Sequence, residues 1–182
     1  MLLKKLGSFL VEILQVVVFA ISIFLFIYLL VMQPHKIKGS SMEPNFHDGE
    51  YLLTDKVSYR FGDPQRGEVI VFKAPPDFKD EFIKRIIGIP GDQVMVKGGH
   101  VYLNDEELVE SYLPDYFITQ AGKIVAEGAA FIVPEGTYLV FGDNRNHSYD
   151  SRNFGSIDRD KIVGRAWFVY WPPSQMGVIS YP

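Results

Sequence analysis

Cysteine is absent from the 182-residue sequence, which excludes a catalytic thiol, a disulfide framework and a cysteine-ligated zinc site. An excess of basic charge is also missing, because 18 lysines and arginines are outnumbered by 22 aspartates and glutamates. The formal net charge of −4 argues against nucleic acid as a partner and against a polybasic patch that binds lipid headgroups. Any attachment to a membrane must therefore come from a hydrophobic segment.

Residues 13–32 contain no charged residue and no proline, and only Gln15 and Ser22 are polar. At about 1.5 Å per residue, a helix of this length measures roughly 30 Å, which is enough to cross the hydrocarbon core of a bilayer. A helix in the core of a soluble domain would show a polar face, and this segment shows almost none. The sequence predicts a transmembrane anchor over residues 13–32, with a lipid bilayer as partner.

The apolar run, preceded by Lys4 and Lys5, also has the form of a cleavable secretory signal. Signal sequences end their apolar region, of about 15 residues at most, in a small-x-small cleavage site, whereas residues 32–35 are bulky or polar. The segment is therefore interpreted as an uncleaved anchor. Its orientation is left open by charge, because Lys36 and Lys38 on one side balance Lys4 and Lys5 on the other.

After residue 34 the pattern changes to short segments rich in β-branched and aromatic residues, separated by turn residues. The predicted strands are residues 50–54, 68–73, 81–87, 93–97, 100–103, 130–133, 137–141 and 162–170. Gly98 and Gly99 connect two of these strands as a tight hairpin turn, because glycine tolerates the positive φ that such a turn requires. Residues 35–182 are therefore predicted to form an all-β domain.

Two parts of this domain carry weaker patterns. Residues 105–136 mix acidic and aromatic residues without a clear period, so residues 93–136 are expected to form a small appended region. Pro172 and Pro173 end the last strand, since proline cannot continue a ladder of hydrogen bonds. The tail beyond them is expected to be peripheral.

Ser41 is the first candidate for chemistry, because it follows the anchor closely and lies in residues 39–44, Gly-Ser-Ser-Met-Glu-Pro. A serine in such a setting is equally typical of a solvated turn. A serine hydroxyl is a weak nucleophile until a neighbouring base removes its proton. Ser41 therefore needs a base from elsewhere in the chain.

Lys84 and Arg85 interrupt an apolar strand, and alternation places them on opposite faces. One of the two is therefore expected to point inward. Charge in a strand can simply guard a sheet edge against aggregation. Alternatively, an apolar environment lowers the pKa of a lysine from about 10.4 toward neutrality, so that Lys84 could serve as a general base.

The loop over residues 142–152 is dense in hydrogen-bonding groups, which suits either a solvated turn or a functional site. An EF-hand is excluded, because neither Asp143 nor Asn144 as first ligand places glycine sixth and glutamate twelfth. His147 and Asp150 suggest a serine-histidine-aspartate triad with Ser41. However, the sequence around Ser41 lacks the second glycine of a nucleophile elbow, and an all-β domain has no α/β sheet to carry one.

Taken together, four ordered motifs resemble those of type I signal peptidases. They are Ser-Met-x-Pro at residues 41–44, Arg-Gly-Glu-Val-Ile-Val-Phe at 66–72, Lys-Arg followed by Gly-x-Pro-Gly-Asp at 84–92, and Gly-Asp-Asn followed by Ser, Asp, Ser and Arg at 142–152. The resemblance implies an all-β catalytic domain of several antiparallel sheets behind one transmembrane helix. It also implies a membrane-bound serine endopeptidase that removes signal peptides from exported preproteins. Residues 1–12 would then be cytoplasmic and residues 35–182 extracytoplasmic. The alternative is a membrane-anchored β-domain that binds partners without cleaving them.

The resemblance also assigns roles to single residues. Ser41 is the expected nucleophile, with its backbone N–H as an oxyanion donor, and Lys84 the expected general base of a Ser/Lys dyad that forms an acyl-enzyme. Supporting residues are Ser148, which would hydrogen-bond to the lysine amine, the ion pair of Asp150 and Arg152, and Asp143 and Asn144 together with Arg85. No metal and no cofactor are expected.

One position departs from the pattern of many Gram-negative members, in which a serine two residues before the nucleophile completes the oxyanion hole. Gly39 occupies that place, so a water molecule or Ser40 is expected to supply the second donor. Glycine here, and the short appended region, resemble the Gram-positive-like branch. The substrate is expected to add as a strand, with shallow apolar pockets for small side chains. The candidates for lining these pockets, all of which could instead be core residues, are Ile37, Met42, Phe46, Phe82 and Ile83.

Overall fold

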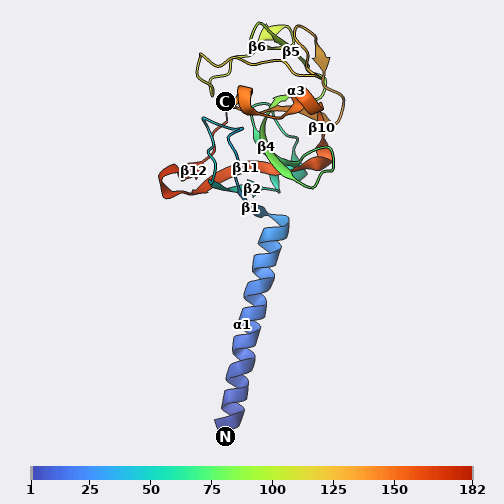
Figure 1. Cartoon of the computed structure of the whole chain (residues 1–182). Helices are drawn as coiled ribbons and strands as arrows, with labels where there is room; N and C mark the ends of the chain where they lie inside the picture. The colour runs from blue at the N-terminus through green and yellow to red at the C-terminus, as the bar shows by residue number, and fades with distance from the viewer. Residues whose placement is uncertain (1, 182) are drawn as a thin grey trace.

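The computed structural model describes residues 2–181, and it consists of one long helix that carries a β-rich domain at its C-terminal end (Figure 1). Helix α1 spans Leu2–Leu30, and its Lys5–Tyr28 segment is apolar and long enough to cross a membrane. None of this segment is buried against the domain. The expected all-β domain behind a single N-terminal apolar helix is confirmed.

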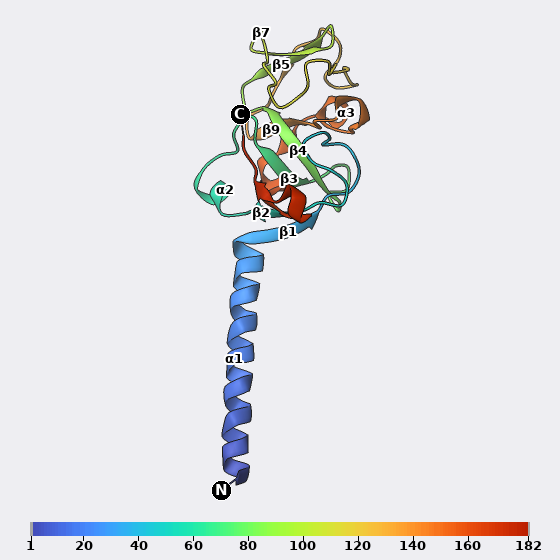
Figure 2. The ribbon, with the colours of Figure 1, turned by 90° about the vertical axis from the view of Figure 1, so that its left-hand side faces the viewer.

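The end of the helix differs from the predicted anchor, because α1 stops at Leu30 and Met32 already begins strand β1, Met32–Lys36. Pro34 has no N–H to continue a helix, and proline disfavours helical backbone in the residue before it. A proline also made these residues unpromising as a strand, but β1 is an edge strand, where proline is tolerated. Figure 2 shows β1 turning away from the helix axis and running along the base of the domain.

The main sheet is antiparallel, with strands in the order β1-β2-β11-β3-β4-β9-β10 and β12 paired to β11. Its further members are β2 (Tyr51–Asp55), β3 (Val69–Lys73), β4 (Glu81–Gly88), β9 (Thr137–Phe141), β10 (Ile157–Asp158), β11 (Ile162–Trp171) and β12 (Gly177–Val178). The predicted strands of this sheet are confirmed to within one residue at each end. The short strands β10 and β12 were not predicted, because a strand of two residues is too short to show an alternation of apolar and polar residues.

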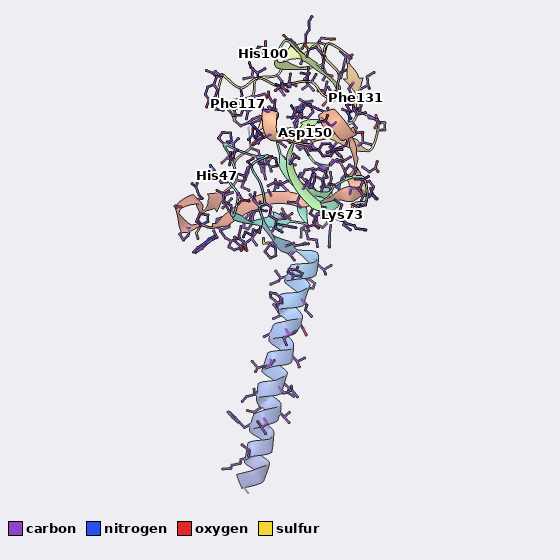
Figure 3. The ribbon with its side chains drawn as sticks, in the orientation of Figure 1. His47, Lys73, His100, Phe117, Phe131 and Asp150 are labelled. Carbon is purple, nitrogen blue, oxygen red and sulfur yellow. The ribbon has the colours of Figure 1, made fainter. Side chains whose placement is uncertain are left out.

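A second antiparallel sheet, ordered β7-β6-β5-β8, forms the appended region at the end of the domain far from α1 (Figure 1). Its strands are β5 (Gln93–Lys97), β6 (His100–Leu103), β7 (Glu106–Glu107) and β8 (Phe131–Ile132). Gly98 and Gly99 have φ values of +60° and +88°, which confirms the predicted hairpin. His100 and Phe131, labelled in Figure 3, mark this sheet, and Asp150 lies between it and the main sheet.

The other helices are short. They are α2 (Ser58–Phe61), α3 (Ser151–Phe154) and the 3-10 turns η1 (Arg145–His147), η2 (Arg159–Lys161) and η3 (Pro173–Gln175). The Asp150 side chain caps α3 by accepting a hydrogen bond from the Arg152 backbone N–H. Thus η1 and α3 give the loop after β9 a defined shape.

Three clusters of buried apolar side chains hold the domain together. One, which includes Ile87 and Val94, joins the main sheet to the appended sheet. The second, which includes Met42 and Val169, lies under the turn that follows β1, and the third covers the face of β3 that carries Ile70. The chain after β1 is therefore fastened to the main sheet by its own apolar residues.

The tail after Pro173 is part of the sheet, so the expectation that it is peripheral is wrong. Val178 in β12 pairs with Phe168 in β11. Tyr181 packs against the second apolar cluster and donates a hydrogen bond to the Ala166 carbonyl. Two prolines ended β11, but the chain reversed at η3 and returned along the same strand.

Candidate functional site

Ser41 lies in a compact turn whose shape depends on residues on both sides of it. Gly39 has φ +83°, in the left-handed region that favours glycine, and its N–H donates to Asp48 Oδ1 at 2.7 Å. Met42 and Phe46 are buried, with 1% and 4% of their surface exposed. The turn is thus held down by apolar anchors after Ser41, while Ser41 itself is half-buried and accessible.

Lys84 Nζ lies 2.7 Å from Ser41 Oγ. The Lys84 side chain is buried, with 3% of the residue exposed, and its Nζ also donates to the Ile83 carbonyl at 2.7 Å. Burial lowers the pKa of Lys84 from 10.5 to about 8, against the opposing effect of the carboxylates of Asp150 and Asp143. The amine is therefore within reach of the hydroxyl and partly neutral near pH 8.

Arg85 is as buried as Lys84, so the expectation that one of the two basic residues points inward understates the structure. The Arg85 guanidinium forms a two-pronged ion pair with Asp143, with Nε–Oδ1 at 2.8 Å and Nη2–Oδ2 at 2.6 Å. The ring of Tyr112, from the appended region, covers the guanidinium at 4.0 Å. Both faces of β4 are covered, because the segment that contains Tyr112, which has no strand pattern in the sequence, packs over the face that carries Arg85.

The loop after β9 is built around Asp150, which is fully buried. Its carboxylate accepts hydrogen bonds from Gly142 N at 2.9 Å and from Arg152 Nε and Nη2 at 2.8 and 2.7 Å. Val140 N donates to Ser151 Oγ at 3.0 Å. The Asp150–Arg152 pair therefore fixes the loop relative to the end of β9.

Ser148 Oγ is buried and has no hydrogen-bond partner among the described residues. The expected hydrogen bond between Ser148 and the Lys84 amine is thus not formed in this structure, where the partners of Nζ are Ser41 Oγ and Ile83 O. Ser148 nevertheless lies near Ser41. A Cβ on Gly142 would lie 2.2 Å from Ser148 Oγ and 2.5 Å from the Ser41 carbonyl oxygen, so Gly142 fits between them only because it has no side chain.

Asn144 contacts the backbone on both sides of Ser41. Its backbone N–H donates to the Ser41 carbonyl at 3.1 Å, and its side-chain Nδ2 donates to the Ser40 carbonyl at 3.0 Å. Asp143, one residue earlier, also accepts from Asn45 Nδ2 at 2.8 Å. The loop after β9 thereby grips the turn that carries Ser41.

The histidine alternative does not assemble. His147 is exposed, and its Nδ1 lies 3.3 Å from Asn144 Oδ1. Asp150, which a triad would require as its partner, is committed to Arg152 and Gly142. Across the part of the chain that the structure describes, no group of three or more histidine, aspartate and glutamate residues is arranged to hold a metal ion.

A cleft with a volume of about 470 Å³ opens beside the Ser41–Lys84 pair. Ile37, Phe82 and Ile83, which were predicted as pocket residues, lie among its lining residues. Met42 and Phe46 lie outside that lining, because both are packed into the core beneath the turn. The lining also includes Glu81, whose Oε2 lies 2.9 Å from His35 Nε2, and the charged residues Lys36, Lys38 and Asp80.

Arg145 and Glu110 are residues of the site region that reasoning from the sequence missed. Arg145 is buried, donates through Nε to the Gly142 carbonyl at 3.1 Å and pairs with the Glu110 carboxylate. Its Nη1 also donates to Thr119 Oγ1 at 2.6 Å. A basic residue inside the 142–152 loop was a usable signal for a buried ion pair, but nothing marks Glu110 in a segment without periodicity.

The chain is similar to known proteins of one family. The family model described as "Signal peptidase, peptidase S26" matches residues 10–171. A probable signal peptidase I-2 from a Synechocystis species is 43% identical over 156 residues, covering 82% of this chain and 68% of that protein. Signal peptidase IB from Staphylococcus aureus is 38% identical over 156 residues, covering 80% of this chain and 81% of that protein. A crystal structure of a signal peptidase I from Enterococcus faecalis aligns with a TM-score of 0.48 at 30% identity, covering 57% of this chain and 97% of that one.

Proposed function

Because the chain belongs to the signal peptidase family of peptidase S26, we propose that its signal-peptide-removing activity uses Ser41 as the nucleophile and Lys84 as the general base. Members of this family are serine peptidases, so the chain is an enzyme and not a β-domain that only binds partners. The observation that carries the assignment of the two residues is the 2.7 Å separation of Lys84 Nζ and Ser41 Oγ at the cleft. The lowered pKa of Lys84 supports it, because a base must be neutral to accept a proton.

Acylation follows from this pair. Neutral Lys84 takes the proton of Ser41 Oγ as the oxygen attacks the carbonyl carbon at the cleavage site, and the carbonyl oxygen becomes an oxyanion. The Ser41 backbone N–H donates to that oxyanion. When the tetrahedral intermediate collapses, the C–N bond breaks and the Lys84 ammonium gives its proton to the leaving amine. The product is an ester between Ser41 and the signal peptide, with the mature protein released.

Deacylation repeats these steps with water. Lys84, neutral again, removes a proton from a water molecule that attacks the ester carbonyl. The second tetrahedral intermediate then expels Ser41 Oγ, which recovers its proton from Lys84, and the signal peptide leaves as a carboxylic acid. One amine thus serves as base and acid in both halves of the reaction.

The supporting residues hold this pair in place. Asp150 and Arg152 fix the loop after β9, and Arg85 with Asp143 fixes the neighbouring face of β4. Asn144 links the loop to the turn of Ser41. Ser148, whose buried hydroxyl lies beside Gly142 and Ser41, is available to the amine once Lys84 changes its partners during turnover.

The substrate fits as an extended strand beside β4. The pairing of β4 with β9 begins only at Arg85, so residues 81–84 have a free edge toward the cleft. Ile37, Phe82 and Ile83 would form shallow apolar pockets there, which suit small side chains before the cleavage site. The partners of this site are therefore the signal peptides of secretory preproteins.

The helix supplies the geometry of access. With α1 in the bilayer, residues 1–12 would lie in the cytoplasm and the domain of residues 35–182 on the extracytoplasmic side, which is the side where preproteins emerge after translocation. Gly39, two residues before Ser41, supports a place in the Gram-positive-like branch of the family. Its φ of +83° gives a physical reason for glycine there, since a serine would be strained.

Cleavage of a purified preprotein in detergent by the wild type and by Ser41→Ala and Lys84→Ala tests the assignment. Each variant is expected to lose activity by several orders of magnitude while keeping the wild-type melting temperature within a few degrees. A folded Ser41→Ala or Lys84→Ala that still cleaves at the wild-type rate would contradict it.

A further inference from the structure

We infer that Asn144 is a positioning residue for the oxyanion hole: its side-chain amide holds the Ser40–Ser41 peptide in the orientation that aims the Ser41 N–H at the substrate carbonyl. This inference rests on the proposed role of Ser41. It adds a function for a residue that touches neither the substrate nor the reacting atoms.

The first step is the geometry of one peptide unit. The Ser40–Ser41 bond is trans. In a planar trans peptide, the carbonyl of Ser40 and the N–H of Ser41 point in opposite directions, so fixing one fixes the other. Asn144 Nδ2 donates to the Ser40 carbonyl at 3.0 Å, and therefore sets the direction of the Ser41 N–H without contacting it.

The second step is that the Ser41 N–H is kept free. Over residues 2–181 it donates to no protein acceptor, whereas the carbonyl groups of Ser40 and Ser41 are both occupied. The Ser41 carbonyl accepts the Asn144 backbone N–H at 3.1 Å, and the Ser40 carbonyl also accepts from Glu43 N at 3.2 Å. The carbonyl groups that flank this N–H are therefore held in place, while the N–H itself stays available to a substrate. An oxyanion donor that is preorganised in this way needs no rearrangement when charge develops.

The third step is the rigidity of Asn144 itself. Asp143 before it is ion-paired with Arg85, and Arg145 after it is ion-paired with Glu110. Asn144 Oδ1 lies 3.3 Å from His147 Nδ1, so the oxygen of the amide faces a histidine and the NH₂ faces a carbonyl. A residue flanked by two buried ion pairs is well suited to carry a fixed donor.

Residue 39 makes this orientation decisive. Gly39 has no hydroxyl to contribute to the oxyanion hole, and the Ser41 N–H carries a larger share of the stabilisation. A rotation of the Ser40–Ser41 peptide would turn that N–H away and bring the Ser40 carbonyl oxygen toward the negative charge. The amide of Asn144 opposes this rotation.

The test compares Asn144→Ala and Asn144→Leu with Asn146→Ala, all in the full-length protein in detergent. Asn146 is a matched control, because it lies in η1, two residues after Asn144 at the N-cap of that turn, and its side chain is exposed. Both Asn144 variants are expected to lower kcat by about 10- to 100-fold and to leave KM within about twofold of the wild type. This decrease in kcat is no larger than the decrease caused by removing an oxyanion donor itself. Asn146→Ala is expected to match the wild type in both constants. Leucine keeps the branched shape and the number of non-hydrogen atoms of the side chain but cannot donate a hydrogen bond, so Asn144→Leu provides the test if Asn144→Ala unfolds.

A pair of inhibitors separates orientation of the oxyanion donor from general loss of structure. Ser41 Oγ gives its proton to Lys84 and adds to the carbon of a peptide aldehyde, the C=O double bond becomes a C–O single bond, and the oxygen of the resulting hemiacetal adduct occupies the oxyanion position. The same peptide ending in an amide binds without this bond. The Asn144 variants are expected to weaken the aldehyde by the same factor as kcat, and to bind the peptide amide as the wild type does.

Two results would overturn the inference. One is wild-type kcat in a folded Asn144→Leu protein, and the other is an equal loss of affinity for aldehyde and amide, which would mean that the cleft itself had changed. Failure of the proposed function looks different, because Ser41→Ala would then keep its activity whatever Asn144 does.

Discussion

Arg145, which is buried, and Glu110, which is partly buried, form an ion pair that joins the loop after β9 to the appended region, across 35 residues of sequence. The Arg145 side chain has no exposed surface, and the same guanidinium reaches the Gly142 carbonyl. The segment around residues 108–120 is therefore a structural part of the site region, although it contributes no group to the cleft lining. Its removal would leave Arg145 buried without a counter-ion.

Glu110→Gln is expected to lower the free energy of unfolding by about 3 kcal/mol, because a buried arginine that loses its partner keeps an uncompensated charge. Glu106→Gln, an exposed acid-to-amide change in the same region, is expected to stay within about 0.5 kcal/mol of the wild type. Urea denaturation of the three proteins in detergent measures both values. Equal stability of the two variants would show that the Arg145–Glu110 ion pair contributes nothing to the free energy of unfolding.

The pH dependence of kcat/KM should report the ionisation of Lys84. Its pKa is lowered by burial to about 8, and the base must be neutral, so kcat/KM is expected to rise with pH through about 8 and then level off. A profile recorded from pH 6 to 10 checks this. A flat profile would exclude a titrating base, and a rise centred above pH 10 would mean that Lys84 is not desolvated.

The same shift in pKa predicts that Lys84 weakens the fold at neutral pH. The folded protein binds fewer protons than the unfolded chain between about pH 8 and 10.5, so stability rises with pH across that window, and below it the buried ammonium costs up to about 3 kcal/mol. Lys84→Met removes the charge at similar volume. It is expected to be more stable than the wild type at pH 7, by about 1–3 kcal/mol, with the difference shrinking toward pH 10.5.

Unfolding by urea at pH 7 and pH 10 measures this change. A Lys84→Met protein that is destabilised by the same amount at both pH values would show that the ammonium is not strained by burial. A gain at pH 7 in an inactive protein would show instead that stability is given up for a reactive amine.

Most strands of the two sheets could be predicted from the sequence. Strands β5 and β6 are marked by alternation around Gly98 and Gly99, so their bounds could be predicted to the residue. Strand β1 could not, because Pro34 hid an edge strand behind the anchor. The packing of Tyr181 on the sheet depends on a chain reversal at η3 that no periodicity announces.

The candidate site shows the same division. Lys84 could be singled out because a lysine in an apolar strand is unusual, and Ser41 only because the joint motifs linked it to Lys84. The partner of Arg145 could not, since an ion pair across the fold leaves no mark on Glu110. The unpartnered hydroxyl of Ser148 was also beyond prediction, because a sequence motif does not fix which acceptors Lys84 Nζ takes, and here these are Ser41 Oγ and the Ile83 carbonyl.

Because the sequence contains no cysteine, a single introduced thiol can test directly whether Lys84 is the general base. Lys84→Cys would carry the only thiol in the chain, at a position that lines the cleft. Alkylation with 2-bromoethylamine restores an amine at nearly the length of lysine, and iodoacetamide adds a neutral group of similar size. The dyad predicts that Lys84→Cys is inactive in preprotein cleavage, that the aminoethylated protein regains activity with a pH profile that titrates, and that the carbamidomethylated protein does not. Activity in unmodified Lys84→Cys, or equal recovery with both reagents, would contradict Lys84 as the general base.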